Sequence, residues 1–206
     1  KVSALGANIT GNDASFQRRV QQPKNGNVGI EDMYLAKDVD KETTSVLEGH
    51  ALFLSQDYLG KWVITKNDVG SFEMGYKTFR TYYDGVGGFF PLNKQWNAMT
   101  PEDLHVDRGN FWATVKLARP NTPEVEISYF DGFRRGKKDA TIWGDSDFTS
   151  LPNNNPPISQ VRKMVPSYRD LDEHRKALEG SVTANVFGNT TAKLTVEWEN
   201  TDNTDT

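Results

Sequence analysis

The sequence has no cysteine among its 206 residues. This absence excludes disulfide scaffolds, zinc fingers, iron–sulfur ligation, thiol nucleophiles and c-type haem attachment within the chain. No run of about 18 apolar residues occurs either, and only 36% of the residues are hydrophobic, so we expect no membrane-spanning helix. A transmembrane β-barrel is compatible with this composition, because its strands carry apolar residues only at alternate positions.

Positive charge is also in the minority. Lysine and arginine total 24 against 28 aspartate and glutamate, which gives a net charge of -4. This balance argues against a nucleic-acid partner. The chain opens with Lys1-Val2-Ser3-Ala4 and shows no secretory signal, so either the protein is cytosolic or a signal has been removed.

Sequence motifs for catalysis are missing as well. No G-x-S-x-G elbow, H-E-x-x-H pair or P-loop is present, and histidine occurs only three times. His105 beside Asp107, and His174 after Asp172, could form acid–base or metal groups. A loop anchor and a salt-bridged strand entry explain these residues more simply. We therefore predict no enzyme activity, catalytic residue, cofactor or metal.

Two further kinds of segment could bind an ion or an anionic group, and the sequence alone does not decide whether they do. Residues 38–42 and 144–147 offer carboxylate oxygens that suit calcium, but neither has the full spacing of an EF-hand loop, and polar turns are the favoured interpretation. Residues 134–138 form a basic run, Arg-Arg-Gly-Lys-Lys. Such a run suits phosphate or lipopolysaccharide headgroups, and we favour a solvated loop.

Alternation of apolar and polar residues points to an all-β protein. Aromatic residues make up 11% of the chain, and strands favour aromatic and β-branched residues. Three hairpins are predicted on this pattern: 58–64 with 72–78, 111–117 with 125–129, and 182–186 with 192–198. Further strands are predicted at 47–53 and, more weakly, at about 2–10 and 29–37. The only stretch that could hold a turn or two of helix is 168–178.

The connections between these strands differ in length. The predicted long connections are 11–28, 84–107 and 132–175, and the short ones are 38–43, 55–57, 67–70, 119–123 and 188–190. In an up-and-down sheet every long connection then lies at the same end. Short periplasmic turns opposite long extracellular loops are typical of outer-membrane barrels. We therefore predict a single domain over 1–206, an antiparallel up-and-down transmembrane β-barrel with long extracellular loops.

The barrel interpretation assigns side chains to lipid or to a wet lumen. The candidates for the lipid-facing side or an aromatic belt are Trp62, Phe111, Val115, Leu194, Val196 and Trp198. The candidates for the lumen are Thr114, Lys116, Lys193, Thr195 and Glu197. A soluble sandwich would alternate in the same way, with its polar row toward bulk solvent, so periodicity does not separate the two.

The number of predicted strands is odd. The pattern predicts about nine strands, whereas bacterial single-chain barrels have an even number. We therefore expect these residues to be the N-terminal part of a larger barrel, or one piece of an assembly.

Several motifs resemble a family of large bacterial outer-membrane β-barrels. They are FRTYYDGVGGFF at 79–90, LHVDRG at 104–109, KDATIWGD at 138–145, DEHR at 172–175, ASFQRR at 14–19 and GIED at 29–32. The family is porin-like and similar to the barrel component of porin–cytochrome electron conduits. The resemblance implies an outer-membrane barrel with the lipid bilayer as its surroundings. It also implies a cytochrome or another barrel subunit as a partner, and any haem would belong to that partner.

The function expected from these observations is porin-like: passage of small solutes, or a sheath around a partner such as a multihaem cytochrome. One alternative is a secreted soluble β-sandwich that binds carbohydrate or a cell surface through aromatic loops. A second is an enzyme that uses the region of His105 or His174. A need for detergent would favour the barrel over the sandwich.

Overall fold

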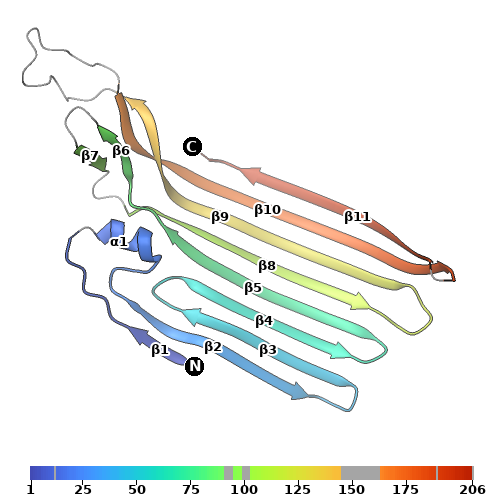
Figure 1. Cartoon of the computed structure of the whole chain (residues 1–206). Coiled ribbons are helices and arrows are strands. Elements are labelled where there is room, and N and C mark those ends of the chain that lie inside the picture. The colour runs from blue at the N-terminus through green and yellow to red at the C-terminus, as the bar shows by residue number, and fades with distance from the viewer. Residues whose placement is uncertain (12, 91–94, 99–102, 145–162, 189, 206) are drawn as a thin grey trace, which may run out of the picture.

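The computed structural model describes residues 1–206 except for 12, 91–94, 99–102, 145–162, 189 and 206. Within the described residues, nine strands form one antiparallel sheet in the order β1-β2-β3-β4-β5-β8-β9-β10-β11 (Figure 1). The strands are β1 Val2–Leu5, β2 Asn27–Asp38, β3 Thr43–Leu52, β4 Asp57–Lys66, β5 Gly70–Tyr82, β8 His105–Leu117, β9 Glu124–Gly144, β10 Lys163–Phe187 and β11 Thr190–Asn203. The predicted all-β, up-and-down arrangement is therefore confirmed.

The connections separate the two ends of the sheet. Tight connections join β2 to β3, β4 to β5, β8 to β9 and β10 to β11 at one end, which we call the turn end. The β4–β5 connection turns through Asp68 (φ 58°) and reaches Gly70 (φ 144°). Positive φ is permitted for glycine and tolerated by aspartate. The sequence of this turn therefore suits the backbone that it must adopt.

The opposite end, which we call the loop end, holds the remaining structure. The β1–β2 connection contains helix α1, Asp13–Val20, and the β5–β8 connection contains the hairpin of β6, Val86–Phe90, and β7, Gln95–Ala98. Helix α1 lies beside the end of β5, and the β6–β7 hairpin lies beside β9 and β10 (Figure 1). The long connections thus lie together at the end that the sequence predicted, and the short β3–β4 turn is at the same end.

Several predicted boundaries are wrong. Most of 132–175 is strand, because β9 continues to Gly144 and β10 begins at Lys163. Residues 168–178, predicted as the one place for a helix, lie inside β10 and pair with β9. The helix is instead α1, which the sequence analysis missed. β1 is also shorter than predicted and ends at Leu5.

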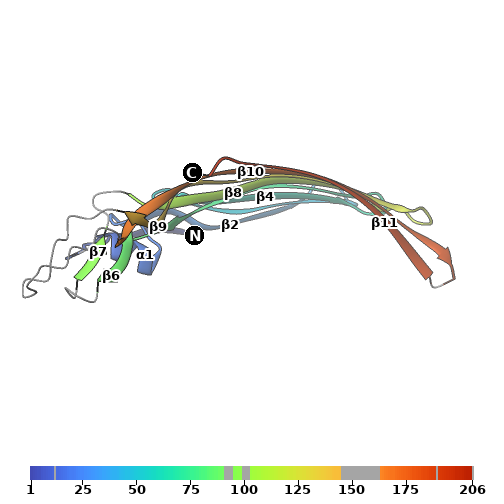
Figure 2. The same ribbon diagram turned by 90° about the horizontal axis from the view of Figure 1, so that it is seen from above.

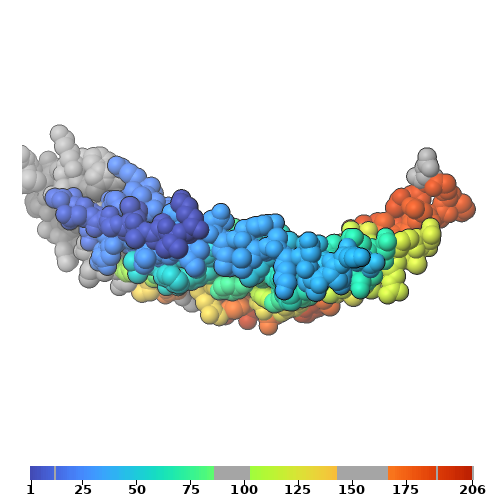
Figure 3. Space-filling model, turned by 90° about the horizontal axis from the view of Figure 1, so that it is seen from below, coloured from blue at the N-terminus to red at the C-terminus, as the bar shows by residue number. Residues whose placement is uncertain are grey.

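The sheet is a single curved layer, seen edge-on in Figure 2 and as a curved outline in Figure 3. The buried large apolar side chains of the described residues are few: Tyr82, Leu104, Val106 and Leu171. Tyr82, Val106 and Leu171 lie in the loop-end half of the sheet, and Leu104 directly precedes β8. No helix in the described part of the chain is long and apolar enough to cross a membrane.

The sheet is open. Of the described strands, β1 and β11 form its two edges, and they do not pair with each other. β1 pairs with only four residues of β2, Asn27 to Ile30. β11 pairs with β10 from Thr190 to Asn203, with one irregularity between Asn185 and Phe187 of β10. One long strand edge and one short strand edge are therefore without a neighbour in the sheet.

Candidate functional site

The register of the sheet decides which side chains share a face. Directly paired residues of antiparallel strands point to the same side, and successive residues along a strand alternate between sides. The pairs can therefore be followed across the sheet from β2 to β11, and each line of paired residues lies on one face.

One line is apolar on every strand that it crosses. It consists of Leu35, Leu47, Trp62, Met74, Ala113, Tyr129, Leu178 and Trp198. We call it the middle row. A soluble protein rarely leaves a continuous apolar stripe of this length uncovered. No second layer covers this stripe among the described residues.

The line two residues nearer the turn end changes character across the sheet. This turn-side row consists of Lys37, Ser45, Ile64, Phe72, Val115, Ile127, Gly180 and Val196. It is polar on β2 and β3, and from β4 to β11 it carries apolar side chains apart from Gly180.

The line two residues nearer the loop end changes in the opposite sense. This loop-side row consists of Met33, Gly49, Gly60, Tyr76, Phe111, Asp131, Lys176 and Asn200. It has no polar side chain from β2 to β8 other than the tyrosine hydroxyl, and it is polar from β9 to β11. We call the apolar residues of the three rows, together with Leu117, Val125, Val182 and Leu194 of the next row, the apolar belt. The belt crosses the strands diagonally and moves toward the turn end from β2 to β11.

The belt ends in aromatic side chains on its loop-end side. On four strands the last apolar residue of the belt before the polar part of this face is aromatic: Tyr76, Phe111, Tyr129 and Trp198. The rings of Phe111 and Tyr129 are neighbours, with centroids 6.3 Å apart. An aromatic band at a polar–apolar boundary is the arrangement seen at membrane–water interfaces.

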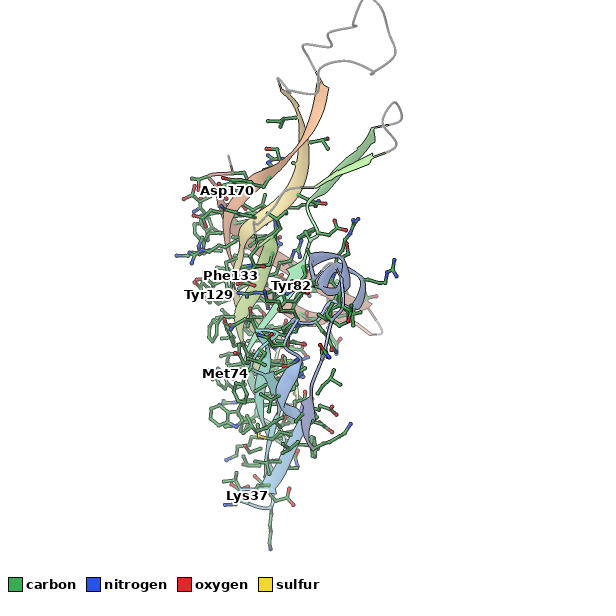
Figure 4. All side chains as sticks on the ribbon, turned by 90° about the vertical axis from the view of Figure 1, so that its left-hand side faces the viewer. Lys37, Met74, Tyr82, Tyr129, Phe133 and Asp170 are labelled. Atoms are coloured by element: carbon green, nitrogen blue, oxygen red, sulfur yellow. The ribbon has the colours of Figure 1, made fainter. Side chains whose placement is uncertain are left out.

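The belt is exposed. On β11 the exposed fractions are 70% for Leu194, 67% for Val196 and 55% for Trp198. In Figure 4 the side chains of Met74, Tyr129 and Phe133 lie on the side of the sheet away from α1. This face therefore presents large apolar side chains outward, on the side of the sheet away from α1.

A groove interrupts the belt where two glycines pair. Gly49 lies opposite Gly60, and a cavity of about 570 Å³ is lined there by Leu35, Leu47, Trp62, Met74, Tyr76 and Phe111, among others. A Cβ atom at Gly60 would meet nothing within 4 Å. The adjacent Trp62 indole donates a hydrogen bond to the Ser45 hydroxyl at 2.9 Å, which satisfies its single polar group.

The opposite face, which we call the polar face, carries charged side chains in pairs across the strands. Lys61 lies 3.4 Å from Glu48 and 3.6 Å from Glu73. The Arg175 guanidinium donates two hydrogen bonds to the Glu199 carboxylate, at 2.9 and 2.8 Å. These groups are partly exposed to water, so the ion pairs add little to the stability of the fold. Their main effect is to favour the observed pairing of neighbouring strands.

Other polar-face contacts follow the same cross-strand pattern. The Trp112 indole donates to Glu73 at 2.8 Å. Lys116 lies 2.8 Å from Glu124. The hydroxyls of Thr114 and Ser128 are 3.1 Å apart. The polar face therefore carries hydrogen-bonded polar and charged side chains across the centre of the sheet.

Helix α1 lies over the polar face at the loop end. The Arg18 guanidinium contacts both carboxylate oxygens of Asp84 at 2.8 Å, and this carboxylate raises the pKa of Arg18 above its ordinary value. The Gln21 amide accepts from the Tyr82 backbone N–H at 2.9 Å and donates to the Tyr82 carbonyl at 3.2 Å. A groove of about 470 Å³ lies between the end of α1 and the polar-face residues His50 and Lys77.

The register separates the predicted site residues into two groups. The six candidates for the lipid-facing side all lie in the apolar belt: Trp62, Phe111, Val115, Leu194, Val196 and Trp198. The five candidates for the lumen all lie on the polar face: Thr114, Lys116, Lys193, Thr195 and Glu197. The candidates lie on β4, β8 and β11 alone, so the sequence analysis missed the belt residues of β2, β3, β5, β9 and β10, although the alternating apolar residues of these strands offered a signal.

The histidine groups are placed apart. His105 begins β8 and lies 3.8 Å from Asp103, whereas His174 lies in β10 against the Arg135 guanidinium. β9 separates the two strands in the sheet. Among the described residues, no group of three or more His, Cys, Asp or Glu side chains is arranged to hold a metal ion.

The candidate calcium segment 38–42 and the basic run 134–138 both make contacts within the fold. The Asp40 carboxylate accepts from the Glu42 backbone N–H at 2.8 Å and from the Thr43 hydroxyl at 3.1 Å, so it closes the β2–β3 turn. The basic run 134–138 lies in β9 and is not a loop. Its Arg135 donates to Asp172 of β10 at 3.1 Å. Residues 145–147 lie outside the described residues.

Comparison of the chain with protein-family models, with curated proteins and with solved structures finds no match. The interpretation of the two faces therefore depends on their geometry and chemistry alone.

Proposed function

We propose that this sheet is part of an outer-membrane β-barrel, with the apolar belt toward lipid and the polar face toward the lumen. The diagonal course of the belt is the observation that carries the proposal. Strands of transmembrane barrels tilt by roughly 35–45°, so a lipid slab of constant height must cross the strand register obliquely.

The composition of the two faces supports the same proposal. Lipid-facing surfaces of barrels are apolar and bordered by aromatic girdles, and their interiors are polar. The belt has an aromatic border at its loop-end side, and the polar face has ion pairs such as Lys61 with Glu48. The lumen side also carries α1, which would narrow the barrel at the loop end.

The function that this arrangement supports best is porin-like. A wet interior lined by paired charges conducts small hydrophilic solutes, or encloses a partner protein such as a multihaem cytochrome. We propose that the loop end faces the outside of the cell and the turn end the periplasm, because outer-membrane barrels keep their turns short on the periplasmic side.

Fractionation of cells that produce the protein tests the location. We expect recovery in the outer membrane and release only by detergent. A soluble species of 23.2 kDa would overturn the barrel and favour the sandwich. Conductance across a planar bilayer then separates a pore from a sheath, because a sheath conducts only when its partner is absent.

Single-cysteine labelling tests the orientation, since the chain has no thiol of its own. We expect a membrane-impermeant maleimide to label Asp103→Cys, at the exposed loop end, on intact cells. Lys41→Cys, in the exposed β2–β3 turn, serves as the matched control and should react only after the cells are opened. The reverse result would invert the proposed orientation.

A further inference from the structure

We propose that the free edge of β11 pairs with an antiparallel transmembrane strand that is neither β1 nor a strand of a second copy of residues 1–206. This inference rests on the proposed function, and it names the partner that the barrel needs. The partner is an amphipathic β-strand with an apolar row toward lipid and a polar row toward the lumen.

The exposure of β11 identifies the surface. All of its 14 residues, Thr190 to Asn203, are exposed. The strand has no proline, and its pairing with β10 is regular from Asn203 to Thr191. Native edge strands are normally short, bulged or protected. A long regular edge within lipid must be paired, because the bilayer offers no hydrogen bonds to its backbone.

The hydrogen-bond pattern shows which amides face this edge. The backbone N–H of Thr204 donates to the Asp172 carbonyl at 3.0 Å. In an antiparallel ladder such bonded pairs alternate with unbonded ones. Even-numbered residues of β11 therefore bond to β10, and odd-numbered residues such as Thr195 direct N–H and C=O groups to the free edge.

Strand direction excludes β1 as the partner. Every neighbouring pair in the nine-stranded sheet is antiparallel, so the first and ninth strands run in the same direction. Pairing of β1 with β11 would be parallel. β1 also offers only four residues, Val2 to Leu5, against the 14 residues of β11.

The same argument excludes a second copy. A copy with the same orientation in the membrane presents a β1 and a β11 edge that both run parallel to this β11. A copy that pairs β11 with β11 in antiparallel fashion must be inverted. Its loop end would then lie on the opposite side of the membrane. Neither arrangement gives an antiparallel barrel of uniform orientation.

The belt predicts the chemistry of the partner strand. Leu194, Val196 and Trp198 are at this edge on the lipid side, and cross-strand neighbours share a face. The partner should therefore carry apolar residues at alternate positions opposite them. On the lumen side it should carry polar residues beside Lys193 and Glu197.

Site-specific photo-cross-linking in outer-membrane preparations tests the inference. A benzoylphenylalanine probe at Thr201 lies on the free edge, and a probe at Ser128, on the same face of the interior strand β9, is the matched control. We expect only the Thr201 probe to give a product with a peptide outside residues 1–206, and we expect that peptide to alternate apolar and polar residues. The inference would be overturned by a cross-link to β1, by a cross-link to a second copy, or by the absence of any cross-link in a membrane-inserted protein.

Two proline substitutions distinguish pairing at the free edge of β11 from pairing of β11 with β10. Thr195→Pro removes a free-edge donor, whereas Val196→Pro removes a donor to β10. We expect Thr195→Pro to lower the yield of the Thr201 cross-link while the protein still enters the membrane, because one donor of the free edge is lost and the rest of the edge stays paired. An unchanged yield would contradict the edge assignment. Failure of the unmodified protein to enter the membrane would instead overturn the proposed function.

Discussion

Adjacent residues of one strand lie in different surroundings. Leu194 and Lys193 are neighbours in β11, yet Leu194 belongs to the apolar belt and Lys193 to the polar face. Along the belt every second side chain is apolar, whereas the intervening side chains include charge pairs across strands, such as Lys61 with Glu48. The comparison teaches that the two faces of this sheet differ in chemistry, and that they should respond to substitution in opposite ways.

The largest expected effect comes from charge on the belt. Leu194→Arg should cost about 2–4 kcal/mol of unfolding free energy if the residue lies near the bilayer midplane. Lys193→Leu, the matched change on the polar face, should cost much less. Urea titration of both variants in lipid vesicles measures the difference. Equal costs at the two positions would show that the faces have the same surroundings.

Glycines on the two faces provide the next test. A Cβ atom at Gly75, on the polar face, would lie 2.2 Å from the Trp112 ring. Gly75→Val should therefore displace the indole from Glu73 and cost about 1–3 kcal/mol. Gly60→Val adds the same side chain on the belt, where space is open, and should be close to neutral. A larger cost at Gly60 would contradict the open groove.

The ion pair between Arg80 and Asp107 tests where the belt ends. Both residues lie on the belt face but nearer the loop end, and the guanidinium makes two hydrogen bonds to the carboxylate at 2.7 and 2.8 Å. A double-mutant cycle with alanine should give a coupling of about 1 kcal/mol, reduced at high salt because water reaches the pair. A coupling energy that does not change with salt would indicate that lipid also covers the sheet at the position of Arg80 and Asp107.

The smallest effect is expected at the turn end, outside both faces. Hydrogen bonds from the Glu42 backbone and the Thr43 hydroxyl lower the pKa of Asp40. Because the pKa is lowered in the folded state, the ionised Asp40 carboxylate stabilises the fold. This stabilisation is complete above the ordinary carboxyl pKa of about 3.9 and is lost as the pH falls below it. Asp40→Asn should therefore show a shallower acid destabilisation than the unmodified chain. Identical pH profiles would show that the turn does not depend on the carboxylate.

The hairpins were predictable because the belt imposes period two. Phe111 to Leu117 alternates, since one side chain in two lies in the belt. The pattern failed beyond the belt: residues 134–138 are charged on both faces, although they form part of β9. Where both faces of a strand are hydrated, nothing selects apolar residues at alternate positions. The predicted loop at 132–175 was therefore mostly strand.

Helix α1 was missed for a different reason. It has no buried residue, so no apolar periodicity marks it. Its position depends on Arg18 and Asp84, which are 66 residues apart in the sequence. Local signals existed in Asp13 at its start and Arg18 and Arg19 at its end, which suit the helix dipole. The diagonal course of the belt could not be predicted either, because it depends on the register between strands, which the sequence alone does not supply.

The meander order has a consequence for assembly. Each strand of the main sheet pairs with the strand before it in the chain, if the inserted β6–β7 hairpin is set aside. Closing a longer connection adds only about 0.6 kcal/mol for each doubling of its length. The sheet can therefore grow hairpin by hairpin from its N-terminal edge, as the chain is delivered. Folding of the sheet then becomes a directional process, in which each completed strand is the template for the next.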